Sequence, residues 1–240
     1  MEGALEDADV ETSSEDYARR FAGPVGRWFL DVQTASTLAL LAPWPGATVV
    51  DVGGGHGQVV APLVDAGYAV TVVGSDPSCG ERIRALVAAG RARFESGDLL
   101  HLPFPDRAFD VALSYRLLPH ARRWPALVAE LCRVARRAVV VDYPTTRSLN
   151  AGAGAFFATK KRIEGNTRPF EVFADAEIEA AFAAHGFHAT ARRPQFFWPM
   201  ALHRALGLAP LSRGLEGAAG LLGLRRVLGS PVILRLEPRG

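Results

Sequence analysis

A glycine-rich turn that directly follows a short apolar segment constrains the fold of this chain more than any other feature. Residues 47–52 have the composition of a buried strand, and the chain then passes through Gly53, Gly55 and Gly57. Glycine is needed where the backbone takes positive φ or where a ligand lies against the main chain. The start of the next helix offers unpaired N–H groups. This order predicts an α/β fold, with either a ligand or only a tight structural turn at the glycines.

Predicted strands alternate with predicted helices along the chain. Further strands are expected over residues 68–73, 92–95, 111–115, 138–143, 187–197 and 231–236, and helices over 57–66, 81–89, 125–134, 176–185 and the Arg-containing stretch 202–228. Asp175 is the expected N-cap of the helix over 176–185. Such alternation is typical of a mostly parallel sheet covered on both faces. We therefore predict a Rossmann-like, doubly wound α/β fold with a seven-stranded sheet.

Composition excludes several classes of protein. Hydrophobic residues make up 49% and charged residues 22% of 240 residues, which is incompatible with a wholly disordered chain. The formal net charge of +2 is too small to imply nucleic acid binding by itself. Two cysteines cannot build a disulfide framework. The acidic start does not resemble a secretory signal, and no apolar run is long enough to span a membrane, so a cytoplasmic location is expected.

The spacing of the glycines distinguishes between two kinds of nucleotide site. The dinucleotide pattern G-x-G-x-x-G fails, because its third glycine would fall on Gln58 or Val60. The pattern D-x-G-x-G-x-G fits Asp51, Gly53, Gly55 and Gly57. Here the sequence resembles the class I S-adenosylmethionine-dependent methyltransferases. The resemblance implies that this loop lies along the methionine part of S-adenosylmethionine.

Two acidic residues follow in the order that this resemblance requires. Asp76 follows the second strand about 20 residues after the glycine turn, where a carboxylate can accept both ribose hydroxyls; the alternative is that it only caps the next helix. Asp98 follows the third strand. By resemblance, Asp98 accepts the adenine amino group and the backbone N–H of Leu99 meets a ring nitrogen. Ser114, at the end of the fourth strand, completes the expected cofactor site.

The segment 109–144 is similar to the small-molecule methyltransferases that include quinone-biosynthesis methylases (methyltransferase type 11), and the resemblance covers about residues 45–144. It implies methyl transfer to a hydroxyl or carbon of a small, largely apolar or aromatic acceptor. Three alternatives remain open: an RNA-directed methyltransferase that uses the Arg-rich C-terminal third, a non-catalytic cofactor-binding protein, and a dehydrogenase. The failed dinucleotide spacing weighs against the dehydrogenase.

The reacting methyl group should face the loops after the fourth and fifth strands. His120 is the expected general base, since an unperturbed histidine titrates near pH 6.5. Tyr115 and Tyr143 are expected to orient the acceptor, and Arg116 is a candidate to hold an anionic group of the substrate. Asp142 ends an apolar strand and needs a partner, for which Arg147 is the candidate. The remaining histidines lack metal-ligand spacing, so no metal is assigned.

The expected organisation is one domain after a short tail. Residues 1–13 are predicted to be a disordered acidic tail. Residues 14–44 form a helical cap, 45–144 the cofactor-binding core, and 145–240 a lid and the last strands, with an insertion after the fifth strand. A small-molecule acceptor and a monomer or homodimer are expected, and nucleic acid is not.

Overall fold

The protein is built around one mixed sheet. Its computed structural model describes residues 6–149 and 170–239. The strand order is β3-β2-β1-β4-β5-β7-β6, with β1 to β5 parallel and β7 antiparallel to both of its neighbours. The strands are β1 Thr48–Val52, β2 Ala69–Gly74, β3 Arg93–Ser96, β4 Phe109–Ser114, β5 Ala135–Tyr143, β6 Phe187–Phe196 and β7 Ser230–Pro238. The predicted seven-stranded, mostly parallel sheet is confirmed.

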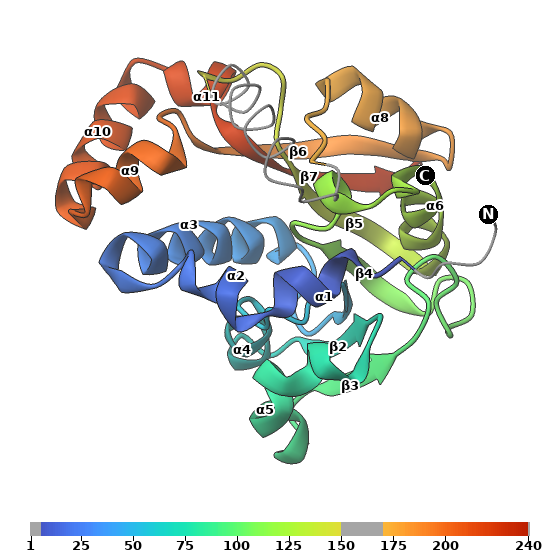
Figure 1. Ribbon diagram of the computed structural model, residues 1–240. Coiled ribbons are helices and arrows are strands. Elements are labelled where there is room, and N and C mark those ends of the chain that lie inside the picture. Colours follow the sequence, from blue (N-terminus) through green and yellow to red (C-terminus); the bar gives the residue numbers. More distant parts are fainter. Residues whose placement is uncertain (1–5, 150–169, 240) are drawn as a thin grey trace.

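Helices cover both faces of the sheet, as Figure 1 shows. Because side chains alternate along a strand, neighbouring residues such as Val49 and Val50 pack into different core clusters. One cluster includes residues of α6 (Trp124–Val134) and α8 (Asp175–Ala183). The other includes residues of α3 (Gly23–Leu41), α4 (Val60–Asp65) and α5 (Arg84–Ala88). The doubly wound arrangement predicted from the sequence is therefore the observed one.

The N-terminal region forms helices α1 (Ala8–Ser13), α2 (Glu15–Arg19) and α3. A helical cap was expected over residues 14–44, and α2 and α3 lie there. The prediction of a disordered tail over residues 1–13 is wrong for residues 8–13, which form α1. Ala8 packs into the core, and the buried carboxylate of Asp9 accepts hydrogen bonds from the backbone N–H and the hydroxyl of Ser75, at 2.7 and 2.5 Å. These tertiary contacts hold a short acidic helix that has little stability of its own. Residues 1–5 lie outside the described residues.

Two other local predictions need correction. The helix expected over residues 81–89 is split into a 3-10 helix, η1 (Pro77–Ile83), and α5. Ala174, not Asp175, is the N-cap residue of α8, because the Asp175 carboxylate accepts hydrogen bonds from the Tyr143 and Thr145 hydroxyls instead.

A helical arm lies between β6 and β7. It consists of α9 (Met200–Leu206), α10 (Ala209–Leu221) and α11 (Leu224–Leu228), in the stretch where a helical segment was expected. Trp28 and Phe29 of α3 pack against Phe196 and Ala209, so this arm is fixed to the N-terminal cap (Figure 1). Most of the insertion expected after the fifth strand lies outside the described residues. No helix in the described part of the chain combines the length and apolar character of a membrane span.

One buried carboxylate organises the helical arm. Glu216 of α10 accepts hydrogen bonds from the backbone N–H groups of Phe197 and Trp198 and is bonded to the buried His203 ring at 3.0 Å. The side chain of Glu216 is only 3% exposed. It therefore joins the end of β6 to α9 and α10.

Replacing Glu216 with alanine should lower the free energy of unfolding by about 3 kcal/mol, because three buried donors lose their acceptor. Urea denaturation followed by circular dichroism measures the change. Glu179→Ala, at an exposed position on α8, is the control and should cost little. A Glu216→Ala variant as stable as the control variant would contradict this role.

Candidate active site

The glycine turn after β1 has a geometry that other residues could not adopt without rearrangement. The φ angles of Gly53 and Gly57 are 72° and 71°, in the left-handed region. A Cβ atom on Gly54 would lie 2.0 Å from a carboxylate oxygen of Asp51. A Cβ atom on Gly55 would lie 2.3 Å from the Ser13 hydroxyl. The turn is thus packed from both sides by its own strand and by helix α1.

Asp51 lies beneath this turn and is almost completely buried. Its Oδ1 atom has no hydrogen-bond partner among the described residues. Burial raises the pKa of this carboxyl group to about 7, against a smaller opposing effect of the Arg116 guanidinium. A buried acceptor without a donor is costly unless a ligand or a proton satisfies it. Asp51 is therefore an open acceptor beside the glycine turn.

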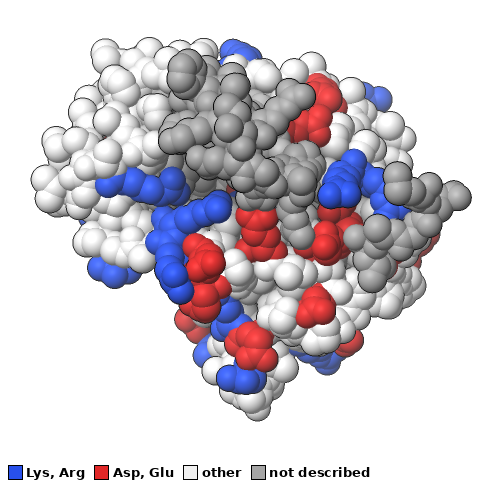
Figure 2. All heavy atoms as spheres, in the orientation of Figure 1, with Lys and Arg blue, Asp and Glu red and all other residues white. Residues whose placement is uncertain are grey.

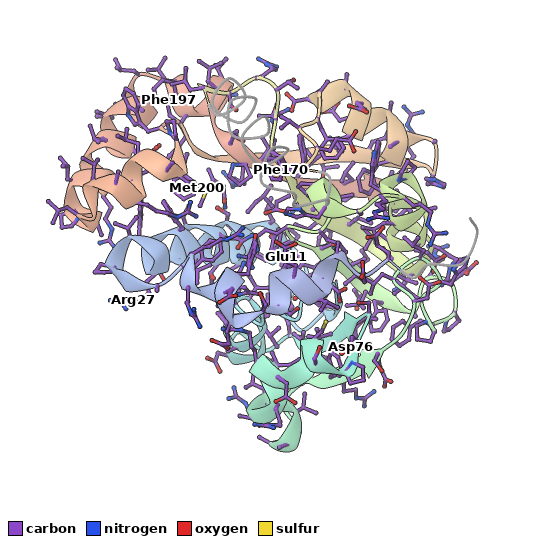
Figure 3. The ribbon with its side chains drawn as sticks, viewed as in Figure 1. Glu11, Arg27, Asp76, Phe170, Phe197 and Met200 are labelled. Carbon is purple, nitrogen blue, oxygen red and sulfur yellow. The ribbon has the colours of Figure 1, made fainter. Side chains whose placement is uncertain are left out.

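The other expected cofactor residues lie at the same edge of the sheet, since parallel strands bring their carboxyl ends together. Asp76 follows β2, is exposed, and accepts a 2.8 Å hydrogen bond from the Ser78 amide, as the capping alternative requires (Figure 3). Asp98 follows β3 and accepts from the Leu100 amide at 2.9 Å. Leu99 is fully buried, and the Ser114 hydroxyl donates to the carbonyl oxygen of Val52.

Helix α1 runs past this row of residues (Figure 1). Ala8 belongs to the same core cluster as Leu99, and Asp9 bonds Ser75, the neighbour of Asp76. Thr12 borders a small pocket that Gly53 and Gly54 also line. Helix α1 therefore lies against the segment before Asp76 and against the glycine turn.

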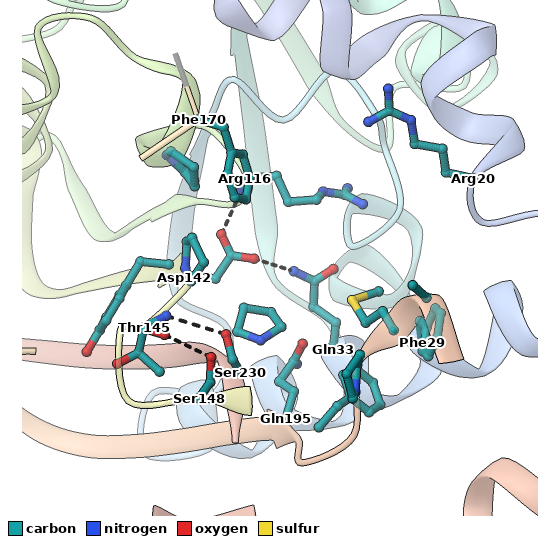
Figure 4. A pocket seen from close by; sticks show the side chains of 18 of the residues that line it. Arg20, Phe29, Gln33, Arg116, Asp142, Thr145, Ser148, Phe170, Gln195 and Ser230 are labelled. Atoms are coloured by element: carbon teal, nitrogen blue, oxygen red, sulfur yellow. Dashed lines mark hydrogen bonds between the residues drawn. The ribbon is translucent and has the colours of Figure 1, made fainter. Parts of the chain in front are cut away.

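A cavity of about 390 Å³ lies next to this edge, beyond the end of β5. Figure 4 shows it from close by. Its walls come from α2, α3, the 3-10 helix η2 (Leu118–His120), the β5 end and α9, and they are mainly apolar. The apolar walls include Phe21, Phe29, Leu30, Pro119, Phe170, Val172, Phe196 and Met200. A cavity of this size and character is suited to a small organic molecule.

Asp142 is an acidic group in the wall of this cavity. Its carboxylate accepts hydrogen bonds from the Arg116 backbone N–H at 2.5 Å and from the Gln33 amide at 3.4 Å (Figure 4). Burial raises its pKa to about 6. The prediction that Arg147 is the partner of Asp142 is wrong, since the guanidinium of Arg147 lies 3.7 Å from the carboxylate of Asp175. Asp142 holds the turn after β4 and faces the cavity at the same time.

The three residues expected to act on the substrate are not equivalent. His120 lines the cavity, with its ring 5.5 Å from that of Phe170. Tyr143 also lines it, but its hydroxyl donates to Asp175 at 3.0 Å. Tyr115 is absent from the cavity lining, and its hydroxyl is bonded to that of Thr37 at 2.6 Å. The geometry brings His120 and Tyr143 together at the cavity and leaves Tyr115 behind it.

Several polar residues of the cavity carried no recognisable signal in the sequence. Gln33, Gln195, Arg20 and Arg204 come from α3, β6, the end of α2 and α9, and they belong to no motif. Their proximity depends on the packing of distant segments. All four lie in parts of the chain outside the methyltransferase-like core of residues 45–144.

The two raised carboxyl pKa values predict a pH dependence of stability. An unfolded Asp titrates near pH 3.9, so between about pH 4 and 7 the folded state holds protons that the unfolded state releases. The contributions of Asp51 and Asp142 to stability are therefore lost as the pH rises through this window. His56 acts in the opposite direction, because burial lowers its pKa to about 3.

Comparing variants isolates the effect of Asp51 from that of His56. Between pH 4.5 and 7.5, the free energy of unfolding of Asp51→Asn should rise relative to the unsubstituted protein by a few kcal/mol, at about 1.4 kcal/mol per unit of pKa shift. Urea denaturation at three pH values measures it. For the control variant Asp31→Asn, on the exposed side of α3, the free energy of unfolding should change with pH as it does in the unsubstituted protein. If the free energy of unfolding of Asp51→Asn and that of the unsubstituted protein change with pH in the same way, the pKa of Asp51 is not raised and the prediction is wrong.

Within residues 6–149 and 170–239, no group of three or more His, Cys, Asp or Glu side chains is arranged to hold a metal ion.

The known proteins that this chain resembles in sequence are methyltransferases. Residues 50–141 match the model of a methyltransferase domain. The chain is 40% identical over 93 residues to an uncharacterized methyltransferase of Mycobacterium avium, a match that covers 38% of this chain and 36% of that protein. It is 34% identical over 148 residues to a demethylmenaquinone methyltransferase of Beutenbergia cavernae, covering 57% and 59% of the two chains. These matches span less than two thirds of either relative.

The fold is also that of solved methyltransferases. The structure of magnesium protoporphyrin IX methyltransferase from Synechocystis with bound S-adenosylhomocysteine superposes with a TM-score of 0.65. The superposition covers 96% of this chain and 98% of that one, at 17% sequence identity. The whole described chain, and not only its central part, thus follows one known architecture.

Proposed function

We propose that the chain is a class I S-adenosylmethionine-dependent methyltransferase and that it transfers a methyl group to a small, largely apolar acceptor bound in the cavity beside β5; the match of residues 50–141 to a methyltransferase domain and the shared fold support this proposal. The observation that carries this proposal is the position of the cavity. It lies next to the edge at which the glycine turn, Asp76 and Asp98 gather. That edge is where ligands bind in open α/β sheets.

The residues at this edge fit S-adenosylmethionine. The cofactor supplies a methyl group that is already activated by its sulfonium centre. Gly53, Gly55 and Gly57 permit close approach to the backbone, and the open Oδ1 of Asp51 is an acceptor for the cationic amino group. Asp76 is the proposed acceptor for the ribose hydroxyls. Asp98 and Leu99 are the proposed adenine contacts, and Ser114 lies beside the glycine turn.

Helix α1 and the cofactor compete for the same space in this proposal. Asp9 bonds Ser75 directly before Asp76, and Ala8 belongs to the same core cluster as Leu99. Binding of the cofactor therefore requires α1 to move away from the edge of the sheet. The helix has only 6 residues, of which Ala8, Asp9 and Thr12 are buried, so its displacement would break the bonds of Asp9 to Ser75 and expose these side chains.

The residues of the cavity would align the acceptor with the methyl group. Alignment of nucleophile and methyl carbon is the main requirement of the reaction. His120 is the proposed base for a hydroxyl acceptor, since its ring faces the cavity. Asp142 lies in the same wall with a raised pKa and is the second group able to take a proton there. Tyr143 would contribute its ring rather than its hydroxyl, which is bonded to Asp175.

The size of the cavity favours a small molecule over RNA as the acceptor. Its walls are mainly apolar, whereas RNA recognition relies on exposed basic and aromatic surfaces. The quinone-related name of the Beutenbergia relative also supports a small acceptor.

The proposal is tested by incubating the protein with a total cell extract, which contains both small metabolites and RNA, and methyl-labelled S-adenosylmethionine. Label should enter the organic-soluble fraction and should be absent from the RNA fraction. Label only in RNA would support the RNA-directed alternative, and no transfer despite cofactor binding would support a non-catalytic protein.

A further inference from the structure

Three arginines converge on one wall of the acceptor cavity. The guanidinium groups of Arg20 and Arg116 lie 4.8 and 5.5 Å from the centre of the Tyr17 ring. Figure 4 shows their side chains extending toward each other. Arg204 of α9 also lines the cavity, interacts electrostatically with Tyr17 and Arg20, and donates to the Arg20 carbonyl oxygen at 3.2 Å. In Figure 2, basic side chains lie side by side in the region between α2 and α9.

Arg116 interacts electrostatically with the Asp142 and Asp51 carboxylates, whereas Arg20 and Arg204 have few negative charges near them. Among the described residues, the only ion pair of Arg20 is with Glu11, at 4.0 Å. Arg204 forms no ion pair with a described carboxylate, and its guanidinium lies 5.6 Å from the centre of the Phe29 ring. Burial and the nearby Arg20 lower the pKa of Arg204, which means that its charge is held at a cost. Both Arg20 and Arg204 are exposed, so their guanidinium groups remain accessible to an anion that enters the cavity.

Arg116 has unused donors in the same wall. Its Nη2 donates to Gln58, whereas its Nε and Nη1 atoms are buried without a partner among the described residues. Its backbone has a φ of 57°, a strained conformation for a residue with a side chain. The Asp142 carboxylate accepts its backbone N–H and helps to keep it there. The strained backbone conformation of Arg116 therefore occurs at a residue whose side chain lines the cavity.

A further residue with an unpaired donor lies in the cavity wall and comes from β6. Gln195 is 5% exposed, lines the cavity, and its Nε2 atom has no hydrogen-bond partner in the described part of the chain. Apart from these donors and the Asp142 carboxylate, the walls are mainly apolar. The cavity therefore has an excess of N–H donors and positive charge on one side and an apolar surface on the other.

We propose that the acceptor is an apolar molecule that carries a carboxylate, and that Arg20 and Arg204 bind this carboxylate while Arg116 contributes a further donor. This inference rests on the proposed function, because it names the class of substrate for that site. Arginine forks match the geometry of a carboxylate and form charge-assisted hydrogen bonds with it. A singly charged group suits the site better than a phosphate, because Asp142 lies in the same cavity.

The cofactor has a carboxylate of its own, so the two sources must be separated. Arg116 is bonded to Gln58, directly after the glycine turn, and is therefore near the expected methionine position. Arg20 and Arg204 belong to the cap and the helical arm, away from that turn. Substitutions of Arg20 and Arg204 should consequently affect the acceptor and leave the cofactor bound.

Calorimetric titration of the full chain with 1-naphthoate and 1-naphthamide tests the inference, since the two probes share a ring system and differ in charge. The unsubstituted protein should bind naphthoate at least about tenfold more tightly than naphthamide. The double variant Arg20→Gln/Arg204→Gln should lose this preference and keep its affinity for naphthamide. Arg213→Gln/Arg226→Gln, at exposed positions on the helical arm, should retain the preference. A 1-naphthyl phosphate arm should show weaker binding than naphthoate.

The inference is overturned if the unsubstituted protein binds both probes equally or neither, if naphthyl phosphate binds more tightly than naphthoate, or if the double variant loses both probes to the same degree. It is also overturned if the double variant loses S-adenosylhomocysteine instead of naphthoate, because the arginines would then hold the cofactor. Failure of the proposed function has a different signature. In that case the unsubstituted protein prefers naphthoate but transfers no methyl group to any carboxylate-bearing acceptor.

Discussion

Replacing His120 with alanine should lower the turnover of methyl transfer by about 10²–10⁴-fold, the usual contribution of a general base. The His120 ring lines the cavity beside Phe170, at the end of the 3-10 helix that follows β4. A hydroxyl acceptor in this cavity would lose the group that takes its proton. Cofactor affinity should stay unchanged, since the glycine turn and Asp76 are intact. The measurement is the pH–rate profile of the two proteins with the acceptor that the labelling experiment identifies.

Two comparisons make this result specific. His185→Ala, at an exposed position after α8, should retain normal turnover. Asp142→Asn reports on the second proton acceptor in the cavity. If His120→Ala keeps full turnover between pH 6 and 9 while Asp142→Asn loses it, the base is Asp142. If both variants keep it, alignment alone carries the reaction.

Replacing Asp76 with alanine should weaken the binding of S-adenosylmethionine at least about tenfold, because two ribose hydroxyls lose a charged acceptor. Asp76 is exposed and already accepts the Ser78 amide, so its carboxylate also caps the 3-10 helix after β2. Asp76→Asn separates the two roles, since it keeps an oxygen for the cap and removes the charge. Calorimetric titration with S-adenosylhomocysteine measures both variants.

The outcome for Asp76 distinguishes a binding residue from a cap. Weaker binding in both variants, with the melting temperature of Asp76→Asn unchanged, supports the ribose contact. Unchanged affinity together with a lower melting temperature in Asp76→Ala would mean that Asp76 is only a cap. Asp31→Ala, on the exposed side of α3, is the matched control.

The sheet and its glycine turn could be predicted because their determinants are local. Short apolar segments that end in Gly or Asp mark β1 and β2, and the spacing from Asp51 to Gly57 sets the kind of nucleotide site. Parallel strands then bring Asp76 and Asp98 to the same edge. These relations depend on the order of residues along the chain and not on the packing of distant parts.

The parts that could not be predicted depend on contacts between distant segments. Helix α1 has an acidic sequence without an apolar period, and it forms because Asp9 meets Ser75 and Ala8 meets the core. Asp142 accepts a hydrogen bond from the backbone N–H of Arg116 and does not pair with Arg147, which is nearer to it in the sequence. Tyr115 follows β4 as expected, but its side chain turns to Thr37 of α3. In each case the contact partner lies in a distant segment, and the local sequence pattern does not indicate which segment that is.

We propose that the edge formed by the glycine turn, Asp76 and Asp98 binds S-adenosylmethionine and that α1 is displaced when it does so. The most direct measurement is calorimetric titration of the full chain with S-adenosylhomocysteine and with NAD, combined with amide hydrogen exchange of residues 8–13. We expect S-adenosylhomocysteine to bind and to raise the melting temperature, NAD to do neither, and the amides of α1 to lose protection on binding. Binding of NAD without binding of S-adenosylhomocysteine would contradict the claim, and unchanged protection of α1 in the complex would contradict its displacement.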